Sequence, residues 1–282
     1  MTEESDRVFV KSNSEPEKAR ENEESIAPPD QVGYLDTVSA TNFARDYKRR
    51  TFEMLAPRPG ARFLDIGCGA GDDVLVLARL VGATGKVVGV DSNPEMIAQG
   101  VERARDSGLP VSFEIEDAHE LHFPDGSFDG TRSDRAVQHM ENPEKAIREM
   151  ARVTVSGGRV VITEPDWETL TIDSSHRAVA RRIVQFISDR AIRNGWIGRQ
   201  LASLFQRAGL DAVDTSGDVF IIRDFQLADR IWGLSLYSGL AQEAGYVTVA
   251  ERDAWLRELQ EAQGARRFFG AMTGFVASGR KL

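Results

Sequence analysis

Phe63-Leu-Asp-Ile-Gly-Cys-Gly-Ala-Gly71 is a short apolar strand that runs directly into a glycine-rich turn. An amphipathic helix is expected over 73–81, so the turn lies between a strand and a helix. In a doubly wound sheet, this is where a nucleotide-like ligand binds. Gly67, Gly69 and Gly71 allow the backbone to approach a ligand without a Cβ in the way, and the helix that follows offers free N–H donors.

The spacing of the turn is Gly-x-Gly-x-Gly, whereas a dinucleotide fingerprint has one more residue before its third glycine. Asp72 and Asp73 stand where the helix begins. Two carboxylates there repel a pyrophosphate and suit a cationic ligand, so the charge argues against NAD. A tight turn without a ligand remains the alternative.

Outward from this turn, apolar strands alternate with amphipathic helices. We expect a leading helix over 34–55, which Pro57-Arg-Pro-Gly60 ends. This order of strands and helices predicts an α/β fold with a doubly wound, mostly parallel sheet. The expected strands are 62–66, 86–90, 111–115, 128–132 and 159–163, and the expected helices are 73–81, 94–105 and 143–153.

The alternation breaks after residue 163. Two helices are expected within 173–210, a strand over 212–223, helices over 225–244 and 250–261, and a final strand over 268–278. The stretches at about 165–200 and 224–262 are interpreted as helical cap insertions in a domain of residues 31–282. Residues 1–30 carry nine acidic and four basic side chains and end at Pro28-Pro29, so they are predicted to be a disordered acidic tail.

Composition excludes several classes of function. The chain has 282 residues, 44 acidic against 35 basic side chains, and a net charge of −9. Without stripes of Lys and Arg, it lacks what nucleic-acid binding requires, so no nucleic-acid partner is expected. Neither a signal peptide nor a long apolar run is found, which predicts a cytoplasmic protein without a membrane partner. The single cysteine, Cys68, excludes an intramolecular disulfide and a cysteine-rich zinc site.

Two more carboxylates follow strand ends. Asp91 ends the second expected strand, where it can accept hydrogen bonds from both ribose hydroxyls, and Asp117 follows the third, where it can accept from an adenine amino group. Each alone is more typical of a solvated strand end. The first expected strand is followed by the glycine turn, and the second and third end at carboxylates. This combination at three successive strand ends favours an adenosyl ligand.

These residues resemble the class I S-adenosylmethionine-dependent methyltransferases over roughly residues 34–166. The resemblance rests on Leu64-Asp-Ile-Gly-Cys-Gly-Ala-Gly71, Gly89-Val-Asp-Ser-Asn-Pro-Glu-Met-Ile97, Glu116-Asp-Ala118, Leu121-His-Phe-Pro-Asp-Gly-Ser-Phe-Asp129, Ala146-Ile-Arg-Glu-Met-Ala-Arg-Val153 and Gly157-Gly-Arg-Val-Val161. The chain is similar to the ubiquinone/menaquinone-type and bacterial natural-product enzymes. That similarity implies a seven-stranded Rossmann-like sheet with 212–223 and 268–278 as an antiparallel edge pair.

The resemblance implies S-adenosyl-L-methionine as the cofactor. Gly67 and Gly69 would bind its homocysteine part, Asp65 belongs to the same motif, and Asp91 would bind the ribose. The remaining implied contacts are Ser92 and Met96 beside the adenine, Asp117 and Ala118 at its amino edge, the backbone around Arg135 under the methionine portion, and Tyr34 near the carboxylate.

Methyl transfer needs an acceptor held in line, and one proton is usually removed. His139 follows the fourth strand and is the predicted general base, while Asp166 follows the fifth strand as its predicted orienting carboxylate. In the alternative interpretation, His139 orders its own loop and Asp166 orders the cap. His119, His122 and His176 show no metal-ligand spacing, so we expect them to be solvated and predict no metal site.

Aromatic residues in the cap stretches are predicted to line an apolar acceptor pocket, with core packing as the alternative for each. They are Trp167, Phe186, Trp196, Trp232, Tyr237 and Tyr246.

The function predicted from the sequence is methyl transfer to an apolar or aromatic small molecule, with O- or C-methylation favoured, in secondary metabolism or quinone-like biosynthesis. Ser133-Asp-Arg-Ala stands where nucleic-acid amino-methyltransferases carry an Asn/Asp-Pro-Pro-aromatic turn. Two alternatives stay open: a member of the fold that binds the cofactor without transferring methyl groups, as a cyclase or regulator, and an NAD-dependent dehydrogenase. The acceptor and the oligomeric state are not specified by the sequence.

Overall fold

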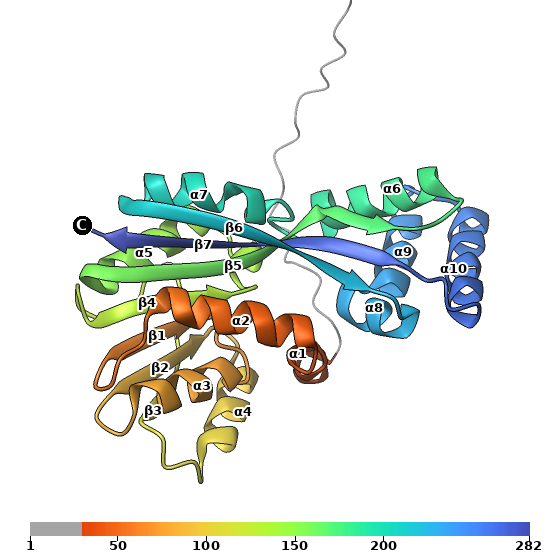
Figure 1. The fold of residues 1–282 in the computed structure, drawn as a ribbon. Coiled ribbons are helices and arrows are strands. Elements are labelled where there is room, and N and C mark those ends of the chain that lie inside the picture. Colours follow the sequence, from red (N-terminus) through yellow and green to blue (C-terminus); the bar gives the residue numbers. More distant parts are fainter. Residues whose placement is uncertain (1–29) are drawn as a thin grey trace, which may run out of the picture.

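A seven-stranded sheet with the strand order β3-β2-β1-β4-β5-β7-β6 organises the chain. The computed structural model describes residues 30–282 (Figure 1). β1 to β5 are parallel, while β7 runs antiparallel to both β5 and β6. The predicted doubly wound sheet with an antiparallel edge pair is therefore confirmed. The strands are β1 Arg62–Ile66, β2 Lys86–Asp91, β3 Val111–Ile115, β4 Phe128–Asp134, β5 Thr154–Ile172, β6 Leu210–Ile222 and β7 Gly270–Lys281.

Helices cover both faces of the parallel part. α2 (Asn42–Leu55) and α3 (Asp72–Val81) pack on one face, and α4 (Pro94–Ala104) lies against β2 and β3. α5 (Pro143–Val153) and α7 (Ile197–Arg207) pack on the other face. The two faces bury separate apolar clusters, so the glycine turn after β1 is held between two packed layers.

β5 is much longer than the predicted strand 159–163, because it continues to Ile172. Pro165 pairs with Gly274 of β7, while the last pair between β4 and β5 is Asp134 with Thr163. From residue 164 onward the β4 side of the strand is free, so Pro165 sits where no N–H is required. The prediction that a helical insertion begins at about 165 is therefore wrong.

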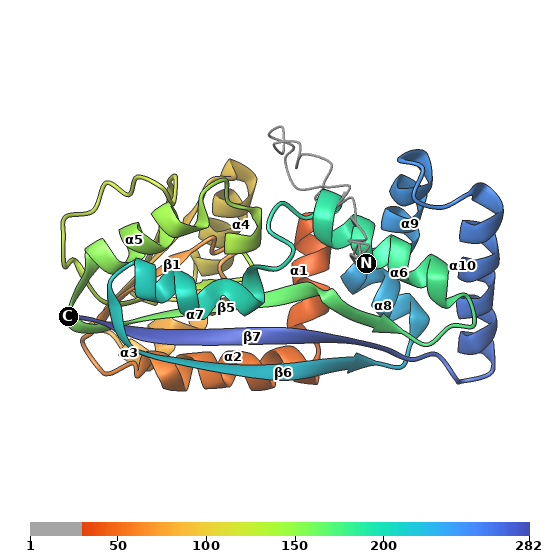
Figure 2. The same cartoon turned by 90° about the horizontal axis from the view of Figure 1, so that it is seen from above.

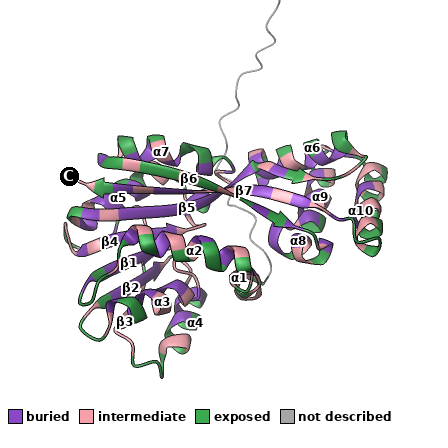
Figure 3. Cartoon of the chain, in the orientation of Figure 1, coloured by how far each residue is buried: buried purple, intermediate pink, exposed green. Residues whose placement is uncertain are grey.

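The cap is built on the extended ends of β5, β6 and β7 (Figure 2). It contains α6 (Arg177–Phe186), the π-helix η2 (Ile187–Ala191), α8 (Phe225–Trp232), α9 (Leu234–Glu243) and α10 (Val249–Gly264). These elements share one apolar cluster with α1 (Gln31–Ser39). Figure 3 shows buried residues continuing along the strands from the sheet into the cap.

Two helices that were expected to be continuous are each divided. Residues 34–55 form α1 and α2, because Thr41 ends the first helix and its side chain accepts a hydrogen bond from Ala44 N at the start of the second (3.1 Å). Residues 225–244 form α8 and α9, separated by Gly233 in the left-handed region (φ +61°).

The predicted acidic tail, residues 1–30, lies outside the described residues except for Asp30, whose side chain accepts from Gly33 N at the start of α1. Among residues 30–282, no helix combines the length and apolar character needed to cross a membrane.

Candidate functional site

The glycine turn after β1 is tight, and two of its glycines are enclosed by neighbouring residues. Gly67 has φ +67°, and a Cβ added there would lie 2.2 Å from the Cβ of Ala136. Gly69 has φ +51°, and a Cβ there would lie 2.9 Å from Leu35 Cδ1. Gly67 therefore requires glycine for conformation and for space, whereas Gly69 requires it for conformation, because only the end of the Leu35 side chain would have to move.

A cavity opens at this turn, with about 380 Å³ of free space when the solvent at its mouth is included. It brings together the predicted residues Asp65, Gly67, Gly69 and Arg135. Asp91 lies beside them, because its Oδ2 accepts a hydrogen bond from Gly69 N (2.9 Å). Residues beyond the prediction complete the wall: Leu35, Ser39, Lys48, Cys68, Ala70, Gly71, Asp72, Asp73 and Asp134.

The residues predicted to contact an adenine lie along the adjacent sheet edge. Asp91 pairs with Ile115, the last residue of β3, and Asp117 follows two positions later. Asp117 Oδ1 accepts from His119 N (2.9 Å) and contacts His119 Nδ1 (2.6 Å), which keeps the pKa of Asp117 below its usual value. Ser92 is exposed, Met96 is buried in α4, and Ala118 is half-buried. The cavity at the glycine turn is not lined by any of the four residues Ser92, Met96, Asp117 and Ala118.

α1 lies between this cavity and a second pocket. Leu35 and Ser39, one turn apart, line the cavity at the glycine turn. Tyr34 and Val38, also one turn apart, line the second pocket. The structure thus places Tyr34 on the second pocket, and Tyr34 reaches the first cavity only through Arg135, whose Nη1 donates to Tyr34 Oη (3.2 Å).

A buried ionic cluster lies beneath the glycine turn. Arg132 is 1% exposed, and its Nη1 lies 3.2 Å from Asp65 Oδ1 and 2.9 Å from Asp73 Oδ2. Its Nη2 lies 3.3 Å from Asp134 Oδ2. Lys48 Nζ adds contacts to Asp73 at 2.8 Å and to Asp134 at 3.5 Å.

This cluster corrects the charge argument made from the sequence. Asp73 is neutralised by Lys48 and Arg132, and Asp72 pairs with Arg103 (2.7 Å). The two carboxylates at the start of α3 therefore do not form an isolated negative site. The exclusion of a pyrophosphate then rests on the glycine spacing alone.

Asp65 and Asp73 titrate in opposite directions because their partners differ. Burial raises the pKa of Asp65 to about 7, although Arg132 opposes the shift. Burial also raises the pKa of Asp73, but the positive charges of Arg132 and Lys48 have the larger effect and lower that pKa below the usual range. Asp65 thus changes charge near neutral pH at the floor of the cavity.

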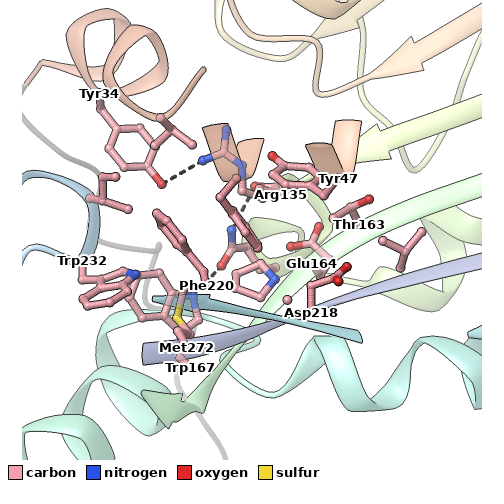
Figure 4. A pocket seen from close by; sticks show the side chains of 17 residues that line it. Tyr34, Tyr47, Arg135, Thr163, Glu164, Trp167, Asp218, Phe220, Trp232 and Met272 are labelled. Atoms are coloured by element: carbon pink, nitrogen blue, oxygen red, sulfur yellow. Dashed lines mark hydrogen bonds between the residues drawn. The ribbon is translucent and has the colours of Figure 1, made fainter. Parts of the chain in front are cut away.

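The second pocket encloses about 630 Å³, including its mouth, and lies where the cap meets the sheet (Figure 4). Its apolar wall includes a stacked pair, Phe43 and Phe220, with ring centroids 4.3 Å apart. Trp167 also lines it, and its Nε1 donates to Gln138 Oε1 (2.7 Å). The other lining residues are Tyr34, Val38, Tyr47, Arg135, Thr163, Glu164, Pro165, Asp218, Ile231, Trp232, Met272, Gly274 and Val276.

Arg135 lines both the glycine-turn cavity and the aromatic pocket. Its backbone adopts φ +57°, and its N–H donates to Thr163 O (2.8 Å). Its side chain is held by Tyr34 and by Asp134, whose Oδ1 lies 3.4 Å from Nε. A ligand in one site therefore contacts the same residue as a ligand in the other.

The expected pairing of His139 with Asp166 is wrong. Asp166 is fully buried and binds Arg199 of α7, with Nη2 to Oδ1 at 2.7 Å. His139 ends the 3₁₀-helix η1 (Val137–His139) and lines neither cavity. His139 is an exposed residue, yet desolvation by the surrounding protein and the charges of Arg135 and Arg193 lower its pKa to about 4.

The predicted aromatic set divides in the structure. Trp167 and Trp232 line the pocket. Tyr237 packs behind Trp167, while Phe186 and Tyr246 pack on each other inside the cap. Trp196 is 39% exposed and stands outside the pocket. Core packing, the alternative for each of these residues, is thus correct for Tyr237, Phe186 and Tyr246.

Two of the histidines expected to be solvated have partners. His119 contacts Asp117, and its Nε2 accepts from Asn142 N (3.1 Å). His122 lies between Glu114 and Glu116, and ligand atoms of these three residues lie within 4.8 Å of one another. This group lies at the outer strand β3, away from both cavities.

Sequence reasoning missed Arg132, Asp134 and Glu164. A charged residue at the end of the expected buried strand 128–132 was the available signal for Arg132, since a buried charge needs partners. Glu164 was hidden by the prediction that β5 ends at residue 163. It is fully buried, and its Oε1 accepts from Val137 N (2.6 Å).

Comparisons with known proteins agree with this geometry. Residues 57–209 match the model of the methyltransferase domain family. A 37.1 kDa protein of transposon TN4556 from Streptomyces fradiae is 41% identical over 251 residues, which cover 89% of this chain and 71% of that protein. The ubiquinone/menaquinone biosynthesis C-methyltransferase UbiE of Burkholderia mallei is 29% identical over 194 residues, covering 64% of this chain and 79% of the enzyme.

Among solved structures, the YcgJ protein of Bacillus subtilis has the same fold, with a TM-score of 0.62 at 21% identity over 84% of this chain and 98% of that one. The family match covers more than half of the sequence and contains the glycine turn, Asp91 and Arg135. The chain therefore belongs to the methyltransferase domain family and is an S-adenosylmethionine-dependent methyltransferase.

Proposed function

We propose that this enzyme methylates an apolar, aromatic small molecule bound in the pocket between the cap and the sheet. The observation that carries the proposal is the position of Arg135 in the wall of both cavities. A cofactor at the glycine turn and an acceptor among the aromatic rings would meet at this residue, as a transfer reaction requires.

The residues at the glycine turn fit S-adenosylmethionine. Gly67 and Gly69 line the cavity without side chains, so their backbone is open to a close approach by a ligand. Asp91 Oδ1 and Oδ2 already accept from Asn93 N and Gly69 N (both 2.9 Å), and each carboxylate oxygen has a further lone pair for a ribose hydroxyl. Lys48 and Arg135 are the cations of the cavity and would pair with a carboxylate.

When bound, S-adenosylmethionine supplies an electrophilic methyl group. The chain itself orients the acceptor and excludes water. Tyr34 and Val38 of α1 close one side of the acceptor pocket, and Phe220 and Trp167 close others. Such positioning can supply most of the rate, since effective molarities reach about 10⁵–10⁸ M. His139 lines neither cavity and does not have Asp166 as its partner, so its role as general base stays a prediction from the sequence.

The aromatic wall supports a flat acceptor, and the name of the UbiE relative supports one of the quinone type. We therefore assign the reaction to O- or C-methylation in quinone-like or natural-product biosynthesis. A cytoplasmic location, the absence of nucleic-acid and membrane partners, and a small-molecule acceptor as the only partner stay predictions from the sequence.

Calorimetry with S-adenosylhomocysteine tests the cofactor site first. Binding is expected for the wild type, with an affinity at least about tenfold lower for Asp91→Ala, because the ribose loses a charged acceptor. Asp106→Ala removes an exposed carboxylate in the loop after α4 and is the control. Absence of binding by the wild type would refute the proposal.

Turnover is tested by incubating the protein with methyl-labelled cofactor and a set of phenols and quinols. Labelled acceptor and demethylated cofactor are expected to form together. Cofactor binding without any labelled product would assign the protein to the non-transferring members of the fold, such as cyclases.

A further inference from the structure

Four buried polar atoms of the residues that line the aromatic pocket have no hydrogen-bond partner among residues 30–282. They are Arg135 Nε, Thr163 Oγ1, Glu164 Oε2 and Trp232 Nε1. An unpaired polar atom in the interior is normally avoided, because its desolvation is not compensated. Their collection around one pocket indicates that the ligand supplies the missing partners.

These atoms lie at two separate places. Figure 4 shows Thr163 and Glu164 on the side of the pocket where Arg135 lies, and Trp232 across the pocket from them. Trp232 belongs to α8, and the Cζ3 edge of its ring lies against β7, where a Cβ on Gly270 would be 2.5 Å away. The ring of Phe220 lies in the wall between the two ends. Phe43 also lines the pocket and stacks on Phe220.

The chemistry of each end restricts the ligand. An indole N–H only donates, so the group at Trp232 must be a hydrogen-bond acceptor such as a carbonyl or ether oxygen. Thr163 carries a hydroxyl that donates or accepts. Burial raises the pKa of Glu164 well above its usual range, so its carboxyl group also occurs in the neutral form, which both donates and accepts. A hydroxyl group fits both residues in either protonation state.

Resting on the proposed function, we propose that the acceptor is a flat molecule with a hydroxyl at the end held by Thr163 and Glu164 and a carbonyl or ether oxygen at the end held by Trp232. Arg135 Nε is a donor without a hydrogen-bond partner in the described part of the chain, at the same end as Thr163 and Glu164, and it suits an oxygen that also accepts a hydrogen bond, as a hydroxyl oxygen does. The hydroxyl end lies beside Arg135 and hence next to the cofactor cavity. A hydroxylated aromatic ketone or a quinol monoether meets both requirements.

Three matched probes test this ligand. The full probe is 6-acetyl-2-naphthol, which carries a hydroxyl and a ketone at opposite ends of a flat apolar core. 6-Ethyl-2-naphthol lacks the ketone, and 2-acetylnaphthalene lacks the hydroxyl. Each dissociation constant is measured by calorimetry on the full chain saturated with S-adenosylhomocysteine. Loss of either group is expected to weaken binding about three- to tenfold, the contribution of one hydrogen bond.

Variants then assign each group to its side chain. Trp232→Phe removes the N–H and is expected to weaken the acetyl probe about three- to tenfold while leaving 6-ethyl-2-naphthol unchanged. Thr163→Val should instead weaken the two naphthols and leave 2-acetylnaphthalene unchanged, whereas Glu164→Gln should change the naphthol affinities less, because its NH₂ group can still donate to the hydroxyl oxygen. Glu164→Gln keeps a carbonyl oxygen for Val137 N. Trp255→Phe is the matched control, because Trp255 Nε1 is also buried without a partner but does not line the pocket.

The outcomes separate this proposal from the proposed function. Equal affinity for the three probes, no binding of any probe, or equal effects of Trp232→Phe and Trp255→Phe would overturn the assigned ligand class. In those cases the binding of S-adenosylhomocysteine in the same titrations leaves the cofactor site standing. Failure of S-adenosylhomocysteine to bind overturns the proposed function itself.

Discussion

Replacement of Gly67 by Ala tests the geometry on which the cofactor site depends. The residue has φ +67°, which costs an alanine about 1–2 kcal/mol. The new Cβ would also lie 2.2 Å from the Cβ of Ala136, whereas carbon atoms in contact are normally about 3.5–4.0 Å apart. The turn after β1 or the loop after β4 must therefore move by more than about 1 Å.

Gly108→Ala isolates the backbone part of this effect. Gly108 has φ +64°, nearly the same as Gly67, but nothing lies within 4 Å of an added Cβ. We expect this variant to lose only about 1–2 kcal/mol of unfolding free energy. Gly67→Ala should lose about 2–5 kcal/mol, because overpacking adds about 1–3 kcal/mol.

Ala136→Gly supplies the complementary test in a double-mutant cycle. It removes the clashing atom, after which the nearest atom of residue 136 to the new Cβ is its Cα at 3.7 Å, an ordinary contact. The double variant Gly67→Ala/Ala136→Gly is expected to recover about 1–3 kcal/mol beyond additivity. Urea unfolding followed by tryptophan fluorescence measures the free energies.

Calorimetric titration with S-adenosylhomocysteine gives the functional readout. Movement of the turn should lower the affinity of Gly67→Ala by at least about tenfold, since positioning errors of about 1 Å are costly at such sites. The affinity of Gly108→Ala should equal that of the wild type. Equal stability losses for Gly67→Ala and Gly108→Ala, together with unchanged affinities, would refute the inference that the turn is shaped by close approach.

Three further perturbations address the charged groups around the site. Arg132→Met leaves the surrounding carboxylates buried with too few cations, so the free energy of unfolding in urea should fall by about 3–5 kcal/mol. The exposed control Arg148→Met should lose less than about 0.5 kcal/mol. Asp65 has a folded pKa of about 7 against an ordinary 3.8, so the folded protein keeps a proton that the unfolded chain releases. Stability should therefore fall as the pH rises from about 4 to about 7, and Asp65→Asn should reduce that slope; equal slopes in urea unfolding would contradict the shift. His139, with a pKa of about 4, should be neutral at pH 7, which NMR titration measures. If it is the general base, His139→Ala should slow turnover by about 10²–10⁴-fold with cofactor affinity intact. A rate within about threefold of the wild type would exclude His139 from catalysis.

The elements that could be predicted are those whose ends are marked locally. The strand 62–66 and the helix 143–153 coincide with β1 and α5. The strand is bounded by Gly60 and by the glycine turn, and the helix begins with Asn142, whose side chain accepts from Lys145 N (2.9 Å), followed by Pro143. Such signals lie within a few residues of the element that they delimit.

The features that escaped prediction depend on residues distant in sequence. β5 passes through Pro165 because β4 has ended beside it and β7, more than one hundred residues later, pairs with it. Asp166 was assigned to the active site because it follows the end of an expected strand. In the structure it instead binds Arg199 of α7, thirty-three residues later in the sequence. Local sequence periodicity does not identify which distant strand pairs with β5 or which distant cation binds Asp166.

The two cavities also differ in where their residues come from, which decides how the acceptor can be inferred. The matching family model spans residues 57–209, which include most of the glycine-turn cavity. The acceptor pocket draws Tyr34 from before that range and Phe220, Trp232 and Met272 from after it. Membership of the family therefore constrains the cofactor through a contiguous motif, while the acceptor is set by α1, the strand extensions and α8. If the proposed function holds, the substrate of this enzyme therefore follows from the side chains of its own pocket.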